Sequence, residues 1–229
     1  MLTLQEMLGK HNGFAPVIKS AKPFKRLDFS ATNEALLQCD LSETSTFSDF
    51  VFKEMLERNA FVGIGGYAEN RVIYRQRKHF NDEAKQPRSI HLGTDIWANA
   101  GEAIHAPLDG TVHSFAFNDH YGDYGPTIIL AHSISNITFY TLYGHLSLAS
   151  LDGLYVGRTI SANQNFAAIG TYPENGDWPP HLHFQIITDM GDFKGDFPGV
   201  SSIQDSEHYL NLCPDPNLIL RTAENGSAT

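Results

Sequence analysis

A chain of 229 residues with 41% hydrophobic and 18% charged residues has an ordinary globular composition and is long enough to bury a core. Its formal net charge of −10 argues against a nucleic-acid binder, because such proteins normally carry a basic patch or stripe. No stretch reaches the roughly 18 apolar residues of a membrane-spanning helix, and residues 1–10 lack the basic start and apolar core of a secretory signal. We therefore expect a cytoplasmic protein, unless a non-classical route exports it.

Two short helices are predicted near the amino terminus, where apolar residues recur at helical spacing over residues 2–11 and 47–58. The segment between them, residues 20–46, mixes proline and polar residues with phenylalanine and leucine. We expect this segment to be irregular and to pack on the main domain. Together these features predict a helical and irregular extension over residues 1–60.

From residue 60 onward, short apolar runs alternate with glycine-containing and polar turns, which predicts strands. The predicted strands lie within residues 60–67, 72–74, 89–97, 101–112, 126–132, 136–143, 156–160, 166–170 and 181–185. Short strands at this density predict a mainly β, mostly antiparallel domain over residues 61–220. Residues 221–229 are predicted to form a flexible tail.

Residues 178–185 read Trp-Pro-Pro-His-Leu-His-Phe-Gln and place two histidines at the head of an apolar run. The two prolines favour an extended entry, and side chains two residues apart in a strand point to the same face. His181 and His183 are therefore expected to project together, as metal ligands do. The polar edge of an ordinary strand is the alternative, since a zinc site needs three or four ligands.

A second candidate cluster lies in residues 89–97. If this segment is extended, His91, Gly93 and Asp95 share one face, with an unhindered glycine between an imidazole and a carboxylate. Zinc accepts both ligand types, and catalytic zinc sites use three protein ligands and a water molecule. His91, Asp95 and one histidine of the 181/183 pair would complete such a set, whereas a surface ion pair is the alternative.

Three motifs occur in a fixed order along this β region. They are His-Leu-Gly-Thr-Asp at 91–95, Tyr-Gly-His-Leu-Ser at 143–147, and His-Leu-His-Phe at 181–184. In these motifs the chain resembles the LytM/lysostaphin-type zinc metallopeptidases, over about residues 71–188. The resemblance implies an antiparallel two-sheet β domain with an open groove. It also implies endopeptidase cleavage of glycine-rich or cross-linking peptides in bacterial peptidoglycan.

The resemblance also assigns roles to five residues. By motif position, His91, Asp95 and His183 are the expected zinc ligands, and His145 and His181 are the expected catalytic histidines. Zinc lowers the pKa of a bound water to about 7, and a nearby histidine can move the proton of that water to the leaving amine. The predicted function is therefore that of a zinc-dependent metalloendopeptidase acting on a peptide substrate, with the division of work between His145 and His181 left open.

The sequence also bears on other functions. A lipoyl or biotin carrier needs an acceptor lysine, and none occurs between Gln86 and Phe193. A zinc-containing module that binds or regulates a peptide without cutting it is the main alternative, and another zinc hydrolase reaction, such as amide deacylation, would use the same residues. The oligomeric state is left open.

The amino-terminal extension supplies one further hypothesis, namely that it blocks the groove by placing a ligand in the open position of the zinc. The candidate blocking residues are His11, Asp28, Asn33 and Asp40.

Overall fold

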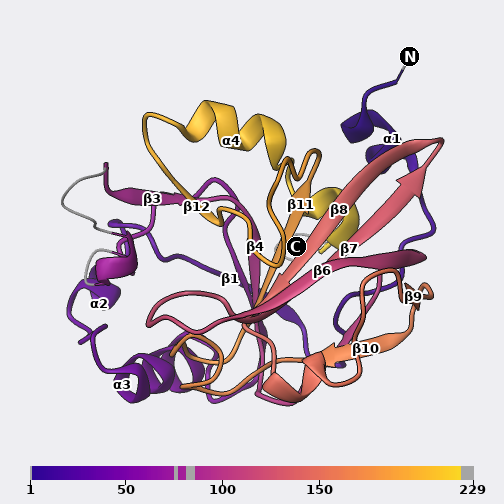
Figure 1. The fold of residues 1–229 in the computed structure, drawn as a ribbon. Helices are drawn as coiled ribbons and strands as arrows, with labels where there is room; N and C mark the ends of the chain where they lie inside the picture. The colour runs from indigo at the N-terminus through magenta and orange to yellow at the C-terminus, as the bar shows by residue number, and fades with distance from the viewer. Residues whose placement is uncertain (1, 75–76, 81–85, 223–229) are drawn as a thin grey trace, which may run out of the picture.

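The computed structural model describes residues 2–74, 77–80 and 86–222, and an eight-stranded sheet runs through them (Figure 1). In spatial order its strands are β1 (Phe24–Leu27), β2 (Val62–Gly65), β4 (Thr94–Trp97), β11 (Leu182–Ile187), β8 (Ile137–Gly144), β7 (Gly125–Ile134), β6 (Gly110–Asn118) and β9 (Thr159–Ile160). The β1–β2 pair is parallel, and the pairs from β2 to β9 are antiparallel. The prediction of a mainly β, mostly antiparallel fold is confirmed.

Two small sheets complete the β structure. One pairs β5 (Ala103–His105) with β10 (Asn165–Ala168), and the other pairs β3 (Arg88–His91) with β12 (Val200–Ser202). The described strands thus form one large and two small sheets, where the resemblance implied two. Because β3 carries His91 and the large sheet carries Asp95 and His183, the candidate ligands come from two sheets.

The helices are short. They are α1 (Leu4–Lys10), α2 (Glu34–Leu37), α3 (Thr44–Asp49), α4 (Ser206–Leu212) and α5 (Asn217–Leu220), with a π-helical turn at Phe50–Met55 and 3₁₀ turns at Lys78–Phe80 and Leu148–Leu151. A capping box between Thr3 and Glu6 fixes the start of α1, which confirms the first predicted helix. The second predicted helix starts earlier, at Thr44, and regular structure ends at Met55. It ends there because residues 57–59 have positive φ angles. Every helix in the described part of the chain is too short or too polar to cross a lipid bilayer.

The amino-terminal extension packs directly on the β domain, as expected for residues 20–46. That segment is not wholly irregular, however, because β1 lies within it and adds a parallel strand beside β2. At the other end, the guanidinium of Arg221 donates to the carbonyls of Leu8, Gly9 and His11 at 2.9–3.0 Å, and α1 contacts α5. Arg221 of the predicted tail is therefore held, as is Thr222, whose amide donates to Oδ1 of Asn217 at 3.1 Å. Residues 223–229 lie outside the described residues.

Two strand predictions were wrong. Residues 72–74 form a bend and turn instead of a strand. The predicted single strand over residues 89–97 is interrupted at Leu92 and Gly93, which separate β3 from β4.

The buried apolar residues of the described chain fall into separate clusters. One cluster fills the centre of the large sheet, with Ile128, Phe139 and Phe184 fully buried. A second cluster, which includes Phe29 and Trp97, joins the amino-terminal helices to the end of the sheet where the candidate ligands lie. In Figure 1, α2 and α3 accordingly lie at the opposite end of the molecule from α1.

Candidate metal centre

Three buried side chains converge where β3, β4 and β11 meet. Asp95 of β4 is the direct cross-strand neighbour of His183 on β11, and His91 ends β3. The Nε2 atom of His91 lies 3.0 Å from Nδ1 of His183 and 3.2 Å from Oδ1 of Asp95. Nδ1 of His183 lies 3.1 Å from the same Oδ1. These three atoms form a nearly equilateral triangle, and their side chains, which the motifs predicted as metal ligands, form a group that could hold a metal ion.

The tautomer of His91 follows from its second ring nitrogen. Nδ1 lies 3.0 Å from the carbonyl oxygen of Gly66, which can only accept a hydrogen bond. The Nδ1 atom of a neutral His91 must therefore carry the proton, and Nε2 presents a lone pair to the triangle.

Gln185 fixes the tautomer of His183 in the same way. Its Nε2 donates to the carbonyl oxygen of Pro198 at 3.1 Å and to Sγ of Cys213 at 3.2 Å, so its Oε1 faces His183. That Oε1 lies 2.9 Å from Nε2 of His183 and accepts its proton. Nδ1 of His183 is thus left bare.

The donor set fits a zinc ion. Two bare imidazole nitrogens and one carboxylate oxygen face one another, and no proton lies between them to offset their repulsion. A tetrahedral zinc with bonds of about 2.0–2.2 Å separates its ligand atoms by about 3.3–3.6 Å, slightly more than the edges of this triangle. Two nitrogens and one oxygen are also ligands that zinc accepts, with a fourth position left for water or substrate.

Gly93, between His91 and Asp95 in the motif, leaves room for the third ligand. A Cβ atom at this position would lie 2.6 Å from both Cε1 and Nε2 of His183 and 2.8 Å from the carbonyl oxygen of Phe184. Contacts this short do not occur between real atoms, so only glycine lets β11 and its histidine approach.

His181 stands beside the triangle, just before β11. Its Nδ1 lies 2.7 Å from the carbonyl oxygen of Pro179, so Nδ1 carries the proton and Nε2 is bare. Nε2 lies 3.9 Å from Oδ2 of Asp95. Burial lowers the pKa of His181 to about 4, so the ring is neutral near pH 7.

His145 stands next to His181, with ring centroids 4.2 Å apart. It follows β8 with a φ of 61°, and its Nδ1 lies 2.8 Å from the carbonyl oxygen of Asn175. Burial holds the pKa of His145 well below its usual range. Both histidines are therefore neutral hydrogen-bond acceptors at Nε2, as a general base must be.

The structure thus brings all five predicted site residues together. All five lie between residues 89 and 194. Residues 89–194 match the model of peptidase family M23. This stretch is an M23 peptidase domain.

Solved structures give weaker likenesses. The catalytic domain of the antimicrobial peptidase lysostaphin from Staphylococcus simulans is 22% identical over 53% of this chain and 80% of that chain, with a TM-score of 0.37. Lysostaphin itself is 26% identical over 60% of this chain and 47% of that chain, with a TM-score of 0.39. A zinc containing peptidase from Vibrio cholerae is 24% identical over 43% of this chain and 27% of that chain, with a TM-score of 0.32.

These TM-scores are low, so the family assignment rests on the match at residues 89–194. This chain also spans less than half the length of the last two proteins. A search of curated proteins found no match.

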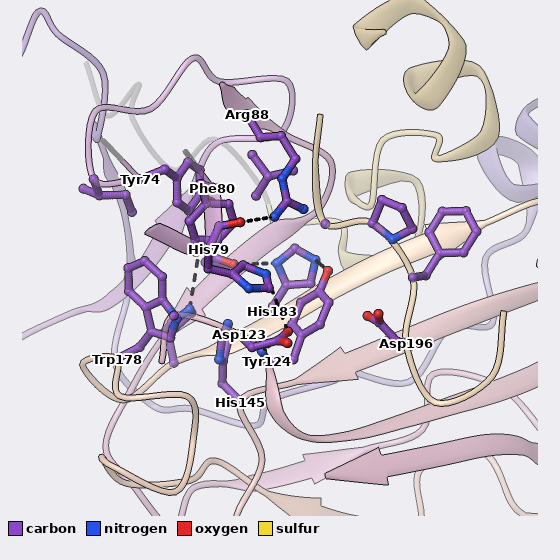
Figure 2. A pocket seen from close by; sticks show the side chains of 18 of the residues that line it. Tyr74, His79, Phe80, Arg88, Asp123, Tyr124, His145, Trp178, His183 and Asp196 are labelled. Atoms are coloured by element: carbon purple, nitrogen blue, oxygen red, sulfur yellow. Dashed lines mark hydrogen bonds and ion pairs between the residues drawn. The ribbon is translucent and has the colours of Figure 1, made fainter. Parts of the chain in front are cut away.

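An open cavity of about 140 Å³ lies over the triangle of the M23 domain (Figure 2). The residues that line it include His145, His181 and His183 and the aromatic side chains of Trp178 and Phe80. Figure 2 shows Trp178 and Asp196 on opposite sides of this cavity.

Two carboxylates besides that of Asp95 also line the cavity of the M23 domain. Burial raises the pKa of both Asp123 and Asp196.

Several residues that support the M23 site were not predicted. Gln185 lies two residues after His183 and therefore on the same face of β11. The alternation of side chains along a strand could have revealed it. Arg71, which contacts Asp95, and Asn175, which binds His145 through its backbone, carry no motif and could be found only in the fold.

Another buried histidine and the proposed blocking residues of the extension lie away from the M23 site. His132 is buried and bonded to Asp109 and Thr141. The proposed blocking residues Asp28, Asn33 and Asp40 make local hydrogen bonds in the extension. Neither these three nor His11 lines the cavity within the described part of the chain.

Proposed function

We propose that this chain is a zinc-dependent endopeptidase, in which His91, Asp95 and His183 hold the metal and His145 and His181 carry out proton transfer. One observation carries the proposal. Three lone pairs converge at distances suited to zinc, and two neutral imidazoles with bare Nε2 atoms stand beside them. The match of residues 89–194 to a peptidase family supports a peptide as the substrate.

The protein residues divide the chemistry as follows. A zinc ion held at the triangle would polarise the scissile carbonyl and lower the pKa of a bound water to about 7. His145 or His181 can accept the proton of the attacking water at Nε2 and return it to the leaving amine, a contribution of about 10²- to 10⁴-fold in rate. Their backbone-bonded Nδ1 atoms hold both rings in the required orientation.

Within this proposal, the substrate class is a glycine-rich peptide or a peptidoglycan cross-link peptide. The motif resemblance supports this class. The open cavity next to the site gives such a peptide access to the catalytic histidines.

The first experiment measures bound zinc together with cleavage of a glycine-rich peptide and of purified peptidoglycan, with and without a chelator. About one zinc per chain and chelator-sensitive cleavage are expected. His208→Ala is the matched control, because His208 is an exposed histidine on α4 and should change neither readout.

The outcomes separate the candidate functions. Zinc without cleavage of either substrate would favour the zinc-containing, non-catalytic binding module. A chain that binds no zinc, in a preparation never exposed to chelator, would overturn the proposal.

A further inference from the structure

Arg71 is a fully buried cation next to the proposed metal centre. Its side chain is 0% exposed, and its Nη1 atom donates to Oδ2 of Asp95. The oxygen that Arg71 contacts is not the one that faces the two ligand histidines, since those lie 3.1 and 3.2 Å from Oδ1. The two carboxylate oxygens of Asp95 therefore have different partners.

Several contacts fix the guanidinium in this position. Its Nε donates to Oε2 of Glu69 at 2.8 Å, and Nη1 also lies 3.2 Å from the hydroxyl of Tyr74. A Cβ atom on Gly65 would lie 2.6 Å from Nη2, so the absence of a side chain at Gly65 makes room for the guanidinium group. The planar guanidinium can meet all these partners at once, which a lysine ammonium cannot do.

The backbone ties Arg71 to the strand that carries His91. The amide of Arg71 donates to Ser89 at 2.9 Å, and the amide of His91 donates to Glu69 at 3.0 Å. The carbonyl of Gly66 accepts from Nδ1 of His91, and Nη2 of Arg71 approaches it at 3.5 Å. One short segment thus positions both a ligand histidine and the cation that holds the ligand carboxylate.

We propose that Arg71 is a positioning residue that keeps Asp95 a monodentate metal ligand. This inference rests on the proposed metal site. With Oδ2 occupied by the guanidinium, the carboxylate offers the metal only Oδ1. A bidentate carboxylate would fill the position that catalytic zinc sites keep for water or substrate, so Arg71 preserves the open position.

The charges support a positioning role over a purely electrostatic one. A lone guanidinium near a divalent cation would repel it and weaken binding. Glu69, whose side chain is 15% exposed, pairs with Arg71 and balances its charge. The Arg71–Glu69 pair therefore adds no net charge next to the site, and its contribution is the orientation of Asp95.

A merely structural ion pair is the competing interpretation, because removal of one member of a buried pair destabilises a fold whatever its function. Metal affinity and coordination number distinguish the two. We compare Arg71→Met and Arg71→Lys with the unaltered chain and with Arg77→Met. Arg77 is the matched control, since it is also buried but stacks on Trp178 at 3.6 Å and donates to Asp177.

The zinc dissociation constant is measured by competition with a chromophoric chelator, under conditions where each variant is folded. Arg71→Met should weaken zinc binding by about 10- to 100-fold, the usual effect of removing a partner of a metal ligand. Arg77→Met should leave the constant unchanged. Arg71→Lys keeps a buried cation without the planar guanidinium, and its zinc dissociation constant should lie between those of the unaltered chain and Arg71→Met. If Arg71→Met does not fold, the comparison of Arg71→Lys with the unaltered chain tests the inference.

Cobalt(II) replaces zinc in a second measurement, because its visible absorption bands report coordination number. The bands of Arg71→Met should shift toward a higher coordination number, as Asp95 becomes free to bind through both oxygens. Unchanged zinc affinity and unchanged cobalt bands in a folded Arg71 variant would overturn the inference.

The failures of the two proposals are distinguishable. If the unaltered chain binds zinc but cleaves no peptide, the proposed enzymatic function fails and the role of Arg71 stands. If the unaltered chain binds no zinc, both fall together.

Discussion

The indole of Trp97 stacks on the imidazole of His181, with ring centroids 4.1 Å apart and ring planes inclined by 15°. Trp97 lies in β4, two residues after Asp95, and is fully buried. The indole also packs against the rings of Phe29 and Phe47 from the amino-terminal extension, with ring centroids 4.9 and 6.1 Å away. The extension therefore supports the orientation of a proposed catalytic histidine through Trp97.

We expect Trp97→Leu to lower kcat by about tenfold, because a loosened His181 loses part of the 10²- to 10⁴-fold contribution of a well-placed base. Bound zinc should stay at the level of the unaltered chain, since Trp97 is not a ligand. Trp97→Phe keeps an aromatic ring in place and should lose less. Measurements of kcat and zinc content check this, and full activity in a folded Trp97→Leu variant would contradict it.

Much of this site could be predicted from sequence because its residues lie in short motifs. The alternation of side chains along a strand predicted that His181 and His183 share one face, and the spacing of His91 and Asp95 around an unhindered glycine predicted that these two face the same way. The expectation that His91 and Asp95 share one strand was wrong. They still meet, because Asp95 pairs directly with His183 across β4 and β11, and His91, the last residue of β3, lies beside both.

What could not be predicted depends on tertiary contacts. Arg71 contacts Asp95, which lies 24 residues later in the sequence. Arg71 itself directly precedes residues 72–74, for which a strand was predicted. Asn175 holds His145 through a backbone carbonyl, so its side-chain type carries no signal for that contact. β1 has few residues, and its place at the edge of the sheet follows from packing against β2.

Gly93 gives a second prediction, on metal affinity. In Gly93→Ala the new methyl group would occupy the space of the His183 ring, so the ring or β11 must shift. We expect zinc affinity to fall by about 10-fold or more, as when a ligand is displaced. Chelator competition measures this, with Gly9→Ala as a control for general glycine effects, since a Cβ atom on Gly9 would lie 4.0 Å from its nearest neighbour and Gly9 has no positive φ angle. Equal zinc affinity in Gly93→Ala and the unaltered chain would refute the steric account.

Two histidine variants separate metal binding from catalysis. His183→Ala removes one of three ligands and should release the metal, whereas His145→Ala should keep the metal and lose about 10²- to 10⁴-fold in kcat. Zinc content and peptide cleavage are measured on the same preparations. Retained zinc in His183→Ala, or full activity in His145→Ala, would reverse these assignments.

The stability of the metal-free chain should depend on pH through its buried neutral histidines. Burial lowers the pKa of His181 to about 4 and also lowers that of His132, whereas histidine in an unfolded chain has a pKa near 6.5. Between about pH 6.5 and 4 the unfolded chain thus binds protons that the folded chain does not. The free energy of unfolding should be highest above about pH 6.5 and fall as the pH drops through this window, by roughly 3 kcal/mol at most from His181. Urea unfolding of chelator-treated protein at about pH 7.5, 6 and 5 measures it. His181→Gln should show a shallower slope, and a stability that is constant or rises toward pH 5 would show that these histidines are not buried in neutral form.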